Sequence, residues 1–192
     1  MRAAEMGATV FLLSPAHAGG KRAGQVRNPA SSGVLARRLH AGEAVSLGEL
    51  FSFLSGLYFR GKLAYASRFA ASPDHVLVIT PHQGLVPAST PVTLGDFAGY
   101  SEVDIDARDP SYRRPLEIDL AGLAMRRDLA RFVLLGSLAK GKYVDVLRGP
   151  LTGRLYFPVD FVGRGDMSRG SLLLRQAREG RELPYAPIED LS

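Results

Sequence analysis

Short apolar runs, each followed by a loop that contains proline or glycine, form the strongest pattern along this chain. The main runs cover residues 8–13, 75–80, 131–135 and 154–159. Each has the length of a strand and is far shorter than the ~20 residues of a membrane-spanning helix. A continuous apolar run is typical of a strand buried on both faces of a parallel sheet. The sequence therefore predicts four buried strands.

Helix signals lie between these runs. Ser31 or Ser32 is expected to cap a short helix that ends near residue 40. Ser46 followed by Glu49 has the spacing of a capping box and predicts a helix start. Two glycines, at positions 56 and 61, are expected to divide that helical stretch into two pieces.

The second half of the chain is less regular. Residues 81–87 are predicted to form a loop because their prolines and glycine interrupt both helix and sheet. Residues 95–115 are predicted to form a polar surface excursion. Helices are expected at about 120–130 and from 136 to about 148. Residues 171–188 fit either a helix or a hairpin turning at residues 179–181, and the hairpin is favoured.

Strands that alternate with helices predict an α/β fold with a mainly parallel central sheet and helices on both faces. The length fits one domain over residues 1–192, with a C-terminal hairpin as an optional addition. Right-handed crossovers would bring the loops that follow the strands to one edge, where ligands bind in such sheets.

The composition limits the chemical groups that a functional site in this chain could use. The chain has no cysteine, which excludes disulfides, thiolate nucleophiles and zinc–thiolate sites. The net charge is +5, and only four of the 24 basic residues are lysine. Guanidinium groups suit phosphate or carboxylate, although arginine-rich codon usage explains the bias equally well. The first residues resemble no signal peptide, so we expect a cytoplasmic protein without a membrane partner.

Four loops follow the predicted strands, at 14–25, 80–87, 136–143 and 160–170, and glycine beside polar residues predicts an anion site there. None has the spacing of a P-loop or a dinucleotide-binding loop. The expected ligand- or phosphate-binding residues of these loops are Ser14, Gly19, Gly20, Lys21, Arg22, Gly84, Lys142, Tyr143, Gly163, Arg164, Gly165 and Arg169.

An aromatic segment beside basic residues adds three more candidates. Tyr58, Arg60 and Lys62 could stack a base and hold its phosphate. The alternative is that Phe59 is core while Arg60 and Lys62 are solvated.

His17 and His82 are the two histidines that directly follow strands, and they are the candidate catalytic residues because histidine titrates near neutral pH. The alternative for each is a purely structural hydrogen bond. Four serines, Ser14, Ser55, Ser137 and Ser168, are nucleophile candidates by position, but no G-x-S-x-G elbow is present, and a role as helix caps or loop hydrogen-bonding residues is favoured. Neither a metal site nor a cofactor is expected, since the histidines and carboxylates are scattered.

Taken in order, these segments resemble a group of small bacterial proteins of unknown function whose fold is similar to that of the uracil-DNA glycosylase superfamily. The resemblance lies in the polar loop 14–22, the segment 57–66, the loop 79–86, Gly141-Lys142-Tyr143 and Gly163-Arg164-Gly165. The Asp-bearing and His-Pro-Ser motifs of active uracil glycosylases are not recognisable. The resemblance thus implies the fold more than the activity.

Three functions follow as hypotheses. The first is an enzyme that processes a nucleoside, a nucleotide or a modified base by cleaving or exchanging an N-glycosidic bond. The second is a non-catalytic module that binds a nucleotide or nucleic acid. The third is an accessory subunit whose arginines dock an acidic protein partner.

Overall fold

A six-stranded sheet with the order β4-β3-β1-β6-β7-β8 organises the protein. The structure is a computed structural model and describes residues 7–139 and 141–191. The strands of this sheet are β1 (Ala8–Leu13), β3 (Val76–Ile79), β4 (Leu85–Pro87), β6 (Leu129–Leu135), β7 (Leu155–Pro158) and β8 (Tyr185–Pro187). A second, two-stranded sheet pairs β2 (Val45–Ser46) with β5 (Pro91–Val92).

Eight α-helices lie among the described residues: α1 (Lys21–Arg27), α2 (Val34–His40), α3 (Leu47–Ser55), α4 (Leu57–Phe69), α5 (Leu94–Gly99), α6 (Pro110–Met125), α7 (Val144–Leu147) and α8 (Asp166–Glu179). Short 3₁₀ helices precede β3 and follow β7 and β8. Helices thus alternate with strands through most of the chain, as expected for an α/β fold.

The four central strands are parallel. β1 pairs with β3 on one side and with β6 on the other, and β6 pairs with β7. Their carboxyl ends therefore share one edge of the sheet, so the four loops that follow them leave from that edge. This confirms the predicted common edge, on which any shared site depends.

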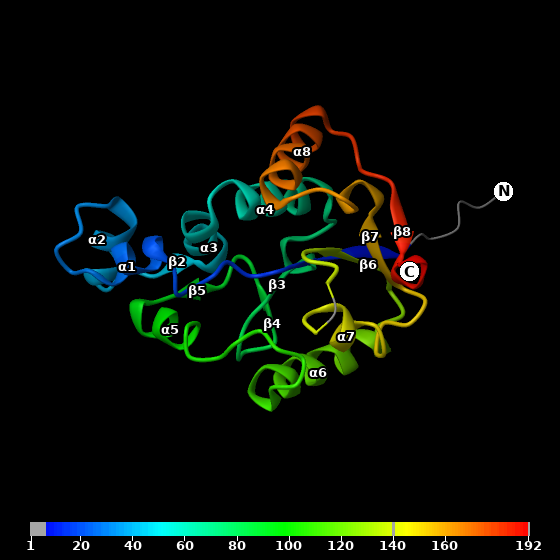
Figure 1. Cartoon of the computed structure of the whole chain (residues 1–192), viewed down its shortest axis with the longest axis horizontal. Helices are drawn as coiled ribbons and strands as arrows, with labels where there is room; N and C mark the ends of the chain where they lie inside the picture. Colours follow the sequence, from blue (N-terminus) through cyan, green and yellow to red (C-terminus); the bar gives the residue numbers. More distant parts are fainter. Residues whose placement is uncertain (1–6, 140, 192) are drawn as a thin grey trace.

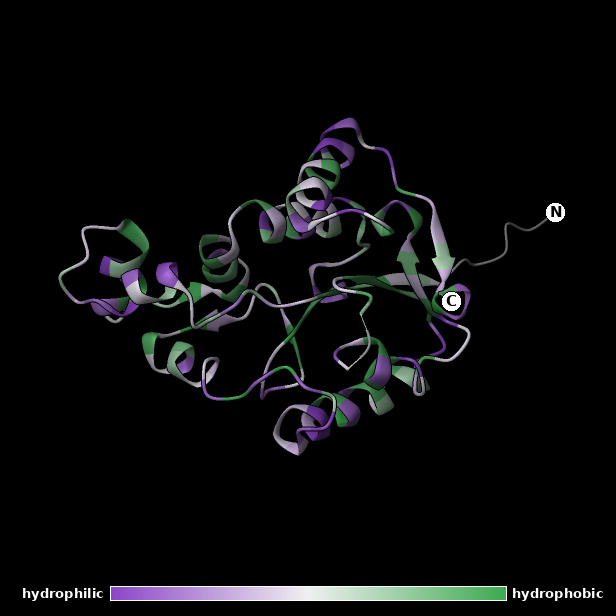
Figure 2. Cartoon of the chain, in the orientation of Figure 1, coloured by the Kyte–Doolittle hydropathy of each residue, from purple (hydrophilic) through white to green (hydrophobic). Residues whose placement is uncertain are grey.

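Two apolar layers cover the sheet because consecutive residues of a strand face opposite sides. Phe11 and Leu13 of β1 pack with α3, α4 and α8, whereas Val10 and Leu12 pack with α6 and α7. Figure 1 shows α3, α4 and α8 above the sheet and α6 and α7 below it. Figure 2 shows that the strands between these layers are mostly hydrophobic. The predicted fold class is therefore confirmed.

Several predicted helix positions were wrong. Residues 21–27 of the expected first loop form α1, and Gly33, not Ser31 or Ser32, is the N-cap of α2. About half of the segment 95–115 is helical, because Thr93 and Asp96 form a capping box at α5 and Pro110 occupies the first turn of α6. Helix α6 covers residues 120–125 of the predicted 120–130 span and ends at Met125, and β6 begins at Leu129.

The expected loop 81–87 ends in a strand, since β4 pairs antiparallel with β3. Pro87 is tolerated there because β4 lies at the sheet edge. At the C-terminus, β7 and β8 form the antiparallel pair that the fold class allowed. The turn is not at residues 179–181, however, because α8 runs to Glu179 and Gly180 ends it in a left-handed conformation.

Only one of the two glycines expected to divide the helical stretch does so. Gly56, with φ of 64°, separates α3 from α4. Gly61 lies inside α4, where a Cβ atom would come within 2.6 Å of the Gly170 carbonyl oxygen in α8. Gly170 meets the backbone of α4 equally closely. These two glycines let α4 and α8 approach each other.

We predict that Gly61→Ala lowers the free energy of unfolding by about 1–3 kcal/mol, the usual cost of overpacking, because the new methyl group meets backbone that cannot rotate away. Gly24→Ala in α1 is the matched control, since nothing lies within 4 Å of its Cβ position. It should stabilise by up to about 1 kcal/mol through helix propensity. Urea unfolding measures both, and equal effects would contradict the packing role of Gly61.

Candidate functional site

The order of the parallel strands creates a switch point beside β1. The chain passes from β1 to β3 on one side and then crosses to β6 on the other. Helices from the two crossovers consequently diverge at the carboxyl ends of β1 and β6. In doubly wound sheets this is where a ligand crevice opens.

A cleft of about 370 Å³ lies at this position. Its walls come from residues 15–19 after β1, Pro81 after β3, residues 100–105 after α5, and Lys142 and Tyr143 after β6. The volume lies within the range of small-molecule sites. Three of the four predicted loops thus contribute to one cavity.

Hydrogen bonds hold the walls of the cleft together. The Arg27 guanidinium donates to the Ala18 carbonyl oxygen at 2.8 Å and to the Ser101 hydroxyl at 2.9 Å, which ties the first wall to the third. On the other side, the Ala107 amide donates to the Gly141 carbonyl oxygen at 3.0 Å. The long segment 101–107 is therefore fixed at both ends.

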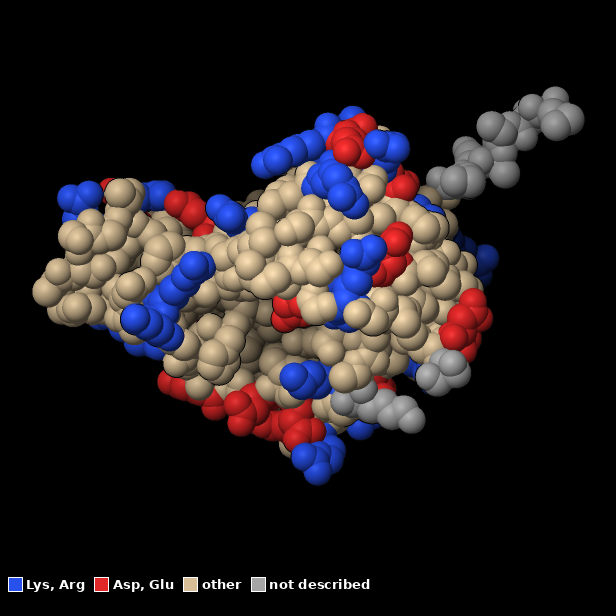
Figure 3. Space-filling model, turned by 45° about the horizontal axis from the view of Figure 1, so that its top comes forward, with Lys and Arg blue, Asp and Glu red and all other residues tan. Residues whose placement is uncertain are grey.

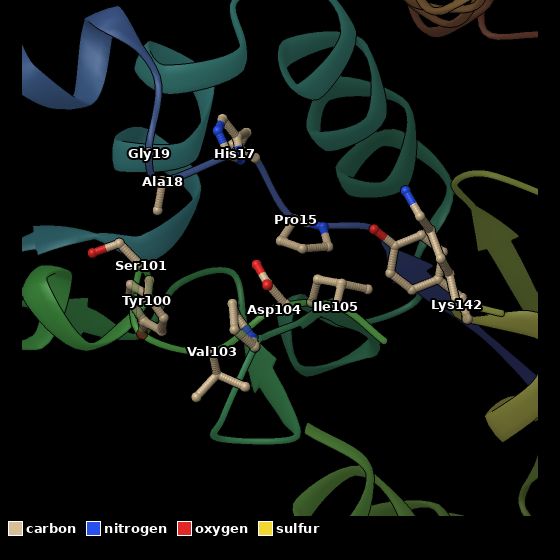
Figure 4. A pocket seen from close by; sticks show the side chains of 13 residues that line it. Pro15, His17, Ala18, Gly19, Tyr100, Ser101, Val103, Asp104, Ile105 and Lys142 are labelled. Carbon is tan, nitrogen blue, oxygen red and sulfur yellow. The ribbon is translucent and has the colours of Figure 1, made fainter. Parts of the chain in front are cut away.

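Three ionisable side chains face the cleft from different elements. His17 and Lys142 stand on opposite sides of the hollow, and the Asp104 carboxylate points into it between them (Figure 4). All three residues are exposed, and Asp104 makes no salt bridge with any described residue. Tyr100, Val103 and Ile105 supply apolar wall. The cleft can therefore contact both polar and apolar parts of a ligand.

A buried lysine lies behind the wall. Lys62 of α4, only 1% exposed, donates from Nζ to the Ser14 carbonyl oxygen at 2.6 Å, and its Nζ lies 2.8 Å from the Ser14 hydroxyl oxygen. Its Nζ also lies 4.4 Å from the centre of the Tyr58 ring. The interpretation of Lys62 as a solvated residue is wrong, because helix α4 directs it inward to the end of β1.

Burial lowers the pKa of Lys62 to about 7, with Asp166 opposing the shift. The amine therefore loses its proton at a lower pH than an exposed lysine does. Burial also raises the pKa of Tyr58 to about 12 and that of Tyr143 further, so both phenols stay protonated. The Tyr58 hydroxyl is buried without a hydrogen-bond partner among the described residues. Ser14, Lys62 and the two phenols form what we call the lysine cluster.

Comparisons with known proteins give no match: no family model, no curated protein and no solved structure matches this chain.

Some of the predicted residues meet at the cleft and others do not. His17, Gly19, Lys142 and Tyr143 line it. Ser14, Tyr58 and Lys62 lie next to it in the lysine cluster. His82 does not line it but packs behind Tyr100, with ring centres 5.4 Å apart.

The other residues of the first two loops have local structural contacts. Gly20 is the N-cap of α1, where Lys21 is exposed and Arg22 donates to the Phe53 carbonyl oxygen at 3.0 Å. Gly84 has φ of 67° and lies directly against Asp119, which accepts a hydrogen bond from the Leu85 amide. These positions shape the loops without facing the cleft.

The remaining predicted residues, from α4 and from the loop 160–170, lie around the start of α8. Arg60 is exposed on α4, and Gly163, Arg164 and Gly165 are exposed before α8. Arg164 donates to the Ser168 hydroxyl at 3.2 Å. Arg169 belongs to α8 and not to a loop, and it donates to the Phe161 carbonyl oxygen at 2.8 Å. None of these residues lines the cleft.

Charge around the cleft is mixed. Figure 3 shows basic side chains above and beside a central hollow and acidic ones gathered below it. Among the described residues that line the cleft, Asp104 is the carboxylate and Lys142 is the lysine. Binding there would depend on individual side chains and not on a uniform positive field.

Asp104 is the residue that sequence reasoning missed as a site residue. It lay in the segment expected to be a surface excursion, and no motif marks it. The one available signal is its position between Val103 and Ile105, which are both half-buried. Apolar neighbours on both sides anchor a residue in a loop more firmly than an ordinary surface position.

Among the described residues, no group of three or more histidines or carboxylates is arranged to hold a metal ion. None of the described helices is both long and apolar enough to span a membrane.

The buried amine of Lys62 predicts a specific pH dependence of stability. The ordinary pKa of a lysine is 10.5, so between pH 7 and 10 the unfolded chain binds a proton at Lys62 that the folded protein does not. Stability therefore rises with pH in this window. We expect the unfolding free energy of the native protein, relative to Lys62→Met, to rise by up to about 1.4 kcal/mol per pH unit.

Urea unfolding at pH 7, 8 and 9 measures this difference. Lys21→Met is the control, because Lys21 is exposed and solvent hydrates its ammonium group in both states. Parallel pH profiles for the native protein and Lys62→Met would show that the buried amine does not titrate in this range.

Proposed function

We propose that the protein binds a nucleoside, a nucleotide or a modified base in the cleft and cleaves or exchanges its N-glycosidic bond. The observation that carries the proposal is the Asp104 carboxylate, which projects into a nucleoside-sized cleft at the switch point, with His17 on one wall and Lys142 on another. The resemblance in motif order to proteins with a uracil-DNA glycosylase-like fold agrees with this choice but carries less weight.

Cleavage of an N-glycosidic bond needs one group that stabilises positive charge and another that neutralises negative charge. As an N-glycosidic bond breaks, positive charge develops on the sugar and negative charge on the departing base. A carboxylate such as Asp104 would stabilise the first, as carboxylates do in glycoside cleavage. His17 would donate a proton to the base as a general acid. The two residues approach from separate walls, so a substrate could lie between them.

The other walls suit the remaining parts of such a substrate. Tyr100, Val103 and Ile105 offer apolar contact to a base, and Lys142 could pair with a phosphate as a point charge. Among the described residues, one lysine lines the cleft, which favours a small phosphorylated or neutral ligand over a long nucleic acid, because the latter needs many basic contacts. His82 takes a supporting place in this proposal, behind the Tyr100 ring.

We expect Asp104→Asn and His17→Gln each to lower kcat/KM about 10²- to 10⁴-fold, the usual contribution of a positioned acid or charge, with little change in stability. Release of free base from a panel of nucleosides, nucleotides and short oligonucleotides, followed by liquid chromatography, measures the rate. Asp74→Asn is the matched control, since Asp74 is exposed and precedes β3 at the opposite edge of the sheet.

Thermal shift with the same panel separates binding from catalysis. A ligand at 100 times its Kd stabilises the fold by about 2.7 kcal/mol. Binding without any product would favour the non-catalytic nucleotide-binding module. Neither product nor a thermal shift with any member of the panel would contradict the proposal, and would leave the acidic protein partner as the remaining hypothesis.

A further inference from the structure

A polar contact behind the cleft joins the hydroxyl of a serine to the amine of a lysine. The Lys62 Nζ and the Ser14 Oγ are 2.8 Å apart, within the distance over which a nucleophile and its base exchange a proton. Gly136 leaves the space that the Ser14 side chain occupies, because a Cβ atom at position 136 would lie 2.8 Å from the Ser14 Cβ and 3.1 Å from its hydroxyl oxygen. A larger residue at position 136 would therefore displace the serine from the amine.

Lys62 is placed to act as a base because its burial disfavours the ammonium form more strongly than the Ser14 carbonyl oxygen, the Tyr58 ring and Asp166 favour it. The amine is buried, and Asp166 is the carboxylate that acts on it. The other ionisable or charged groups near the pair are Tyr58 on the same helix, Tyr143 at the start of α7 and Arg169 on α8, which acts on Tyr58. A neutral amine has a lone pair with which to accept a proton from Ser14.

The pair lies one side chain away from the cleft. Pro15, the next residue, and Tyr143, which interacts with Ser14, both line it. Ser14 is itself 5% exposed, so a substrate would reach it from the cleft between these two neighbours. Tyr58, whose ring centre lies 4.4 Å from Lys62 Nζ, has a buried hydroxyl with no hydrogen-bond partner among the described residues. That hydroxyl could donate to an oxygen that becomes negative during a reaction.

We propose that Ser14 is a nucleophile activated by Lys62, and that this Ser–Lys dyad cleaves an ester or a related acyl compound that enters from the cleft. The Ser14 oxygen forms a bond to the acyl carbon while its proton passes to Lys62 Nζ. The ester C–O bond then breaks, and the leaving alcohol takes that proton. Water, which gives a proton to Lys62, attacks the acyl-serine and releases the acid, and the proton returns to Ser14.

This activity is separate from the proposed N-glycosidic chemistry, which uses Asp104 and His17. Failure of one would leave the other standing. The serine activity can be tested without a known substrate, because small fluorophosphonates react with activated serines. In that reaction a serine O–P bond forms and the P–F bond breaks, and the proton leaves with fluoride through the base.

The test is peptide mass spectrometry of the full chain after exposure to a small alkyl fluorophosphonate at pH 6, 7 and 8. We expect one adduct, on Ser14, with a rate that rises through pH 7 as the amine loses its proton. Lys62→Met should slow labelling by about 100-fold or more. Ser14→Ala should abolish it. Ser89 is the internal control, because it is exposed yet has no lysine beside its hydroxyl among the hydrogen-bonded pairs of the described residues.

Two results would overturn the proposal: no Ser14 adduct at pH 8, or an adduct that forms at the same rate in Lys62→Met. If Lys62→Met does not fold, the pH profile of the native protein decides. A labelling rate on Ser14 that does not change between pH 6 and 8, after correction for hydrolysis of the probe, would exclude Lys62 as the base.

Discussion

The burial of β1 between two parallel neighbours is the constraint on which the rest of the structure depends. Its apolar residues face two cores at once, so a register shift of one residue would exchange the two faces. The strand is thereby fixed along its length. Its end is fixed as well, because the Ser14 amide donates to the Leu135 carbonyl oxygen of β6 at 3.1 Å. The cleft opens directly after this fixed point.

Lys62 links that strand end to the helical layer. Burial of an amine is unfavourable unless its hydrogen bonds are satisfied, and here both the carbonyl and the hydroxyl oxygen of Ser14 lie within reach of Nζ. Leucine or methionine would fill the same space without that cost. A buried amine at a position where an apolar residue would be more stable is a candidate for a functional role. Lys62 therefore belongs both to the packing of α4 on the sheet and to the proposed chemistry.

The sequence predicts the architecture well because continuous apolar runs determine the central strands. It predicts the site less well. The sequence predicts His17, Lys142 and Tyr143 at this edge of the sheet because they follow strands. Asp104 reaches the cleft because it lies between α5 and α6, and the sequence alone does not predict the path of that segment. The lysine cluster depends on the direction in which α4 points Lys62, and that follows from the packing of Gly61 against Gly170 in α8. Local patterns do not contain this tertiary information.

The central claim is that ligands meet the protein at the switch point after β1. Backbone amide shift mapping by NMR, with a mixture of the four common ribonucleoside 5′-monophosphates as the probe, tests it most directly. We expect the largest shifts in residues 15–19, 100–105 and 141–143. Shifts centred instead on the exposed arginines around the start of α8, with the cleft unchanged, would contradict it.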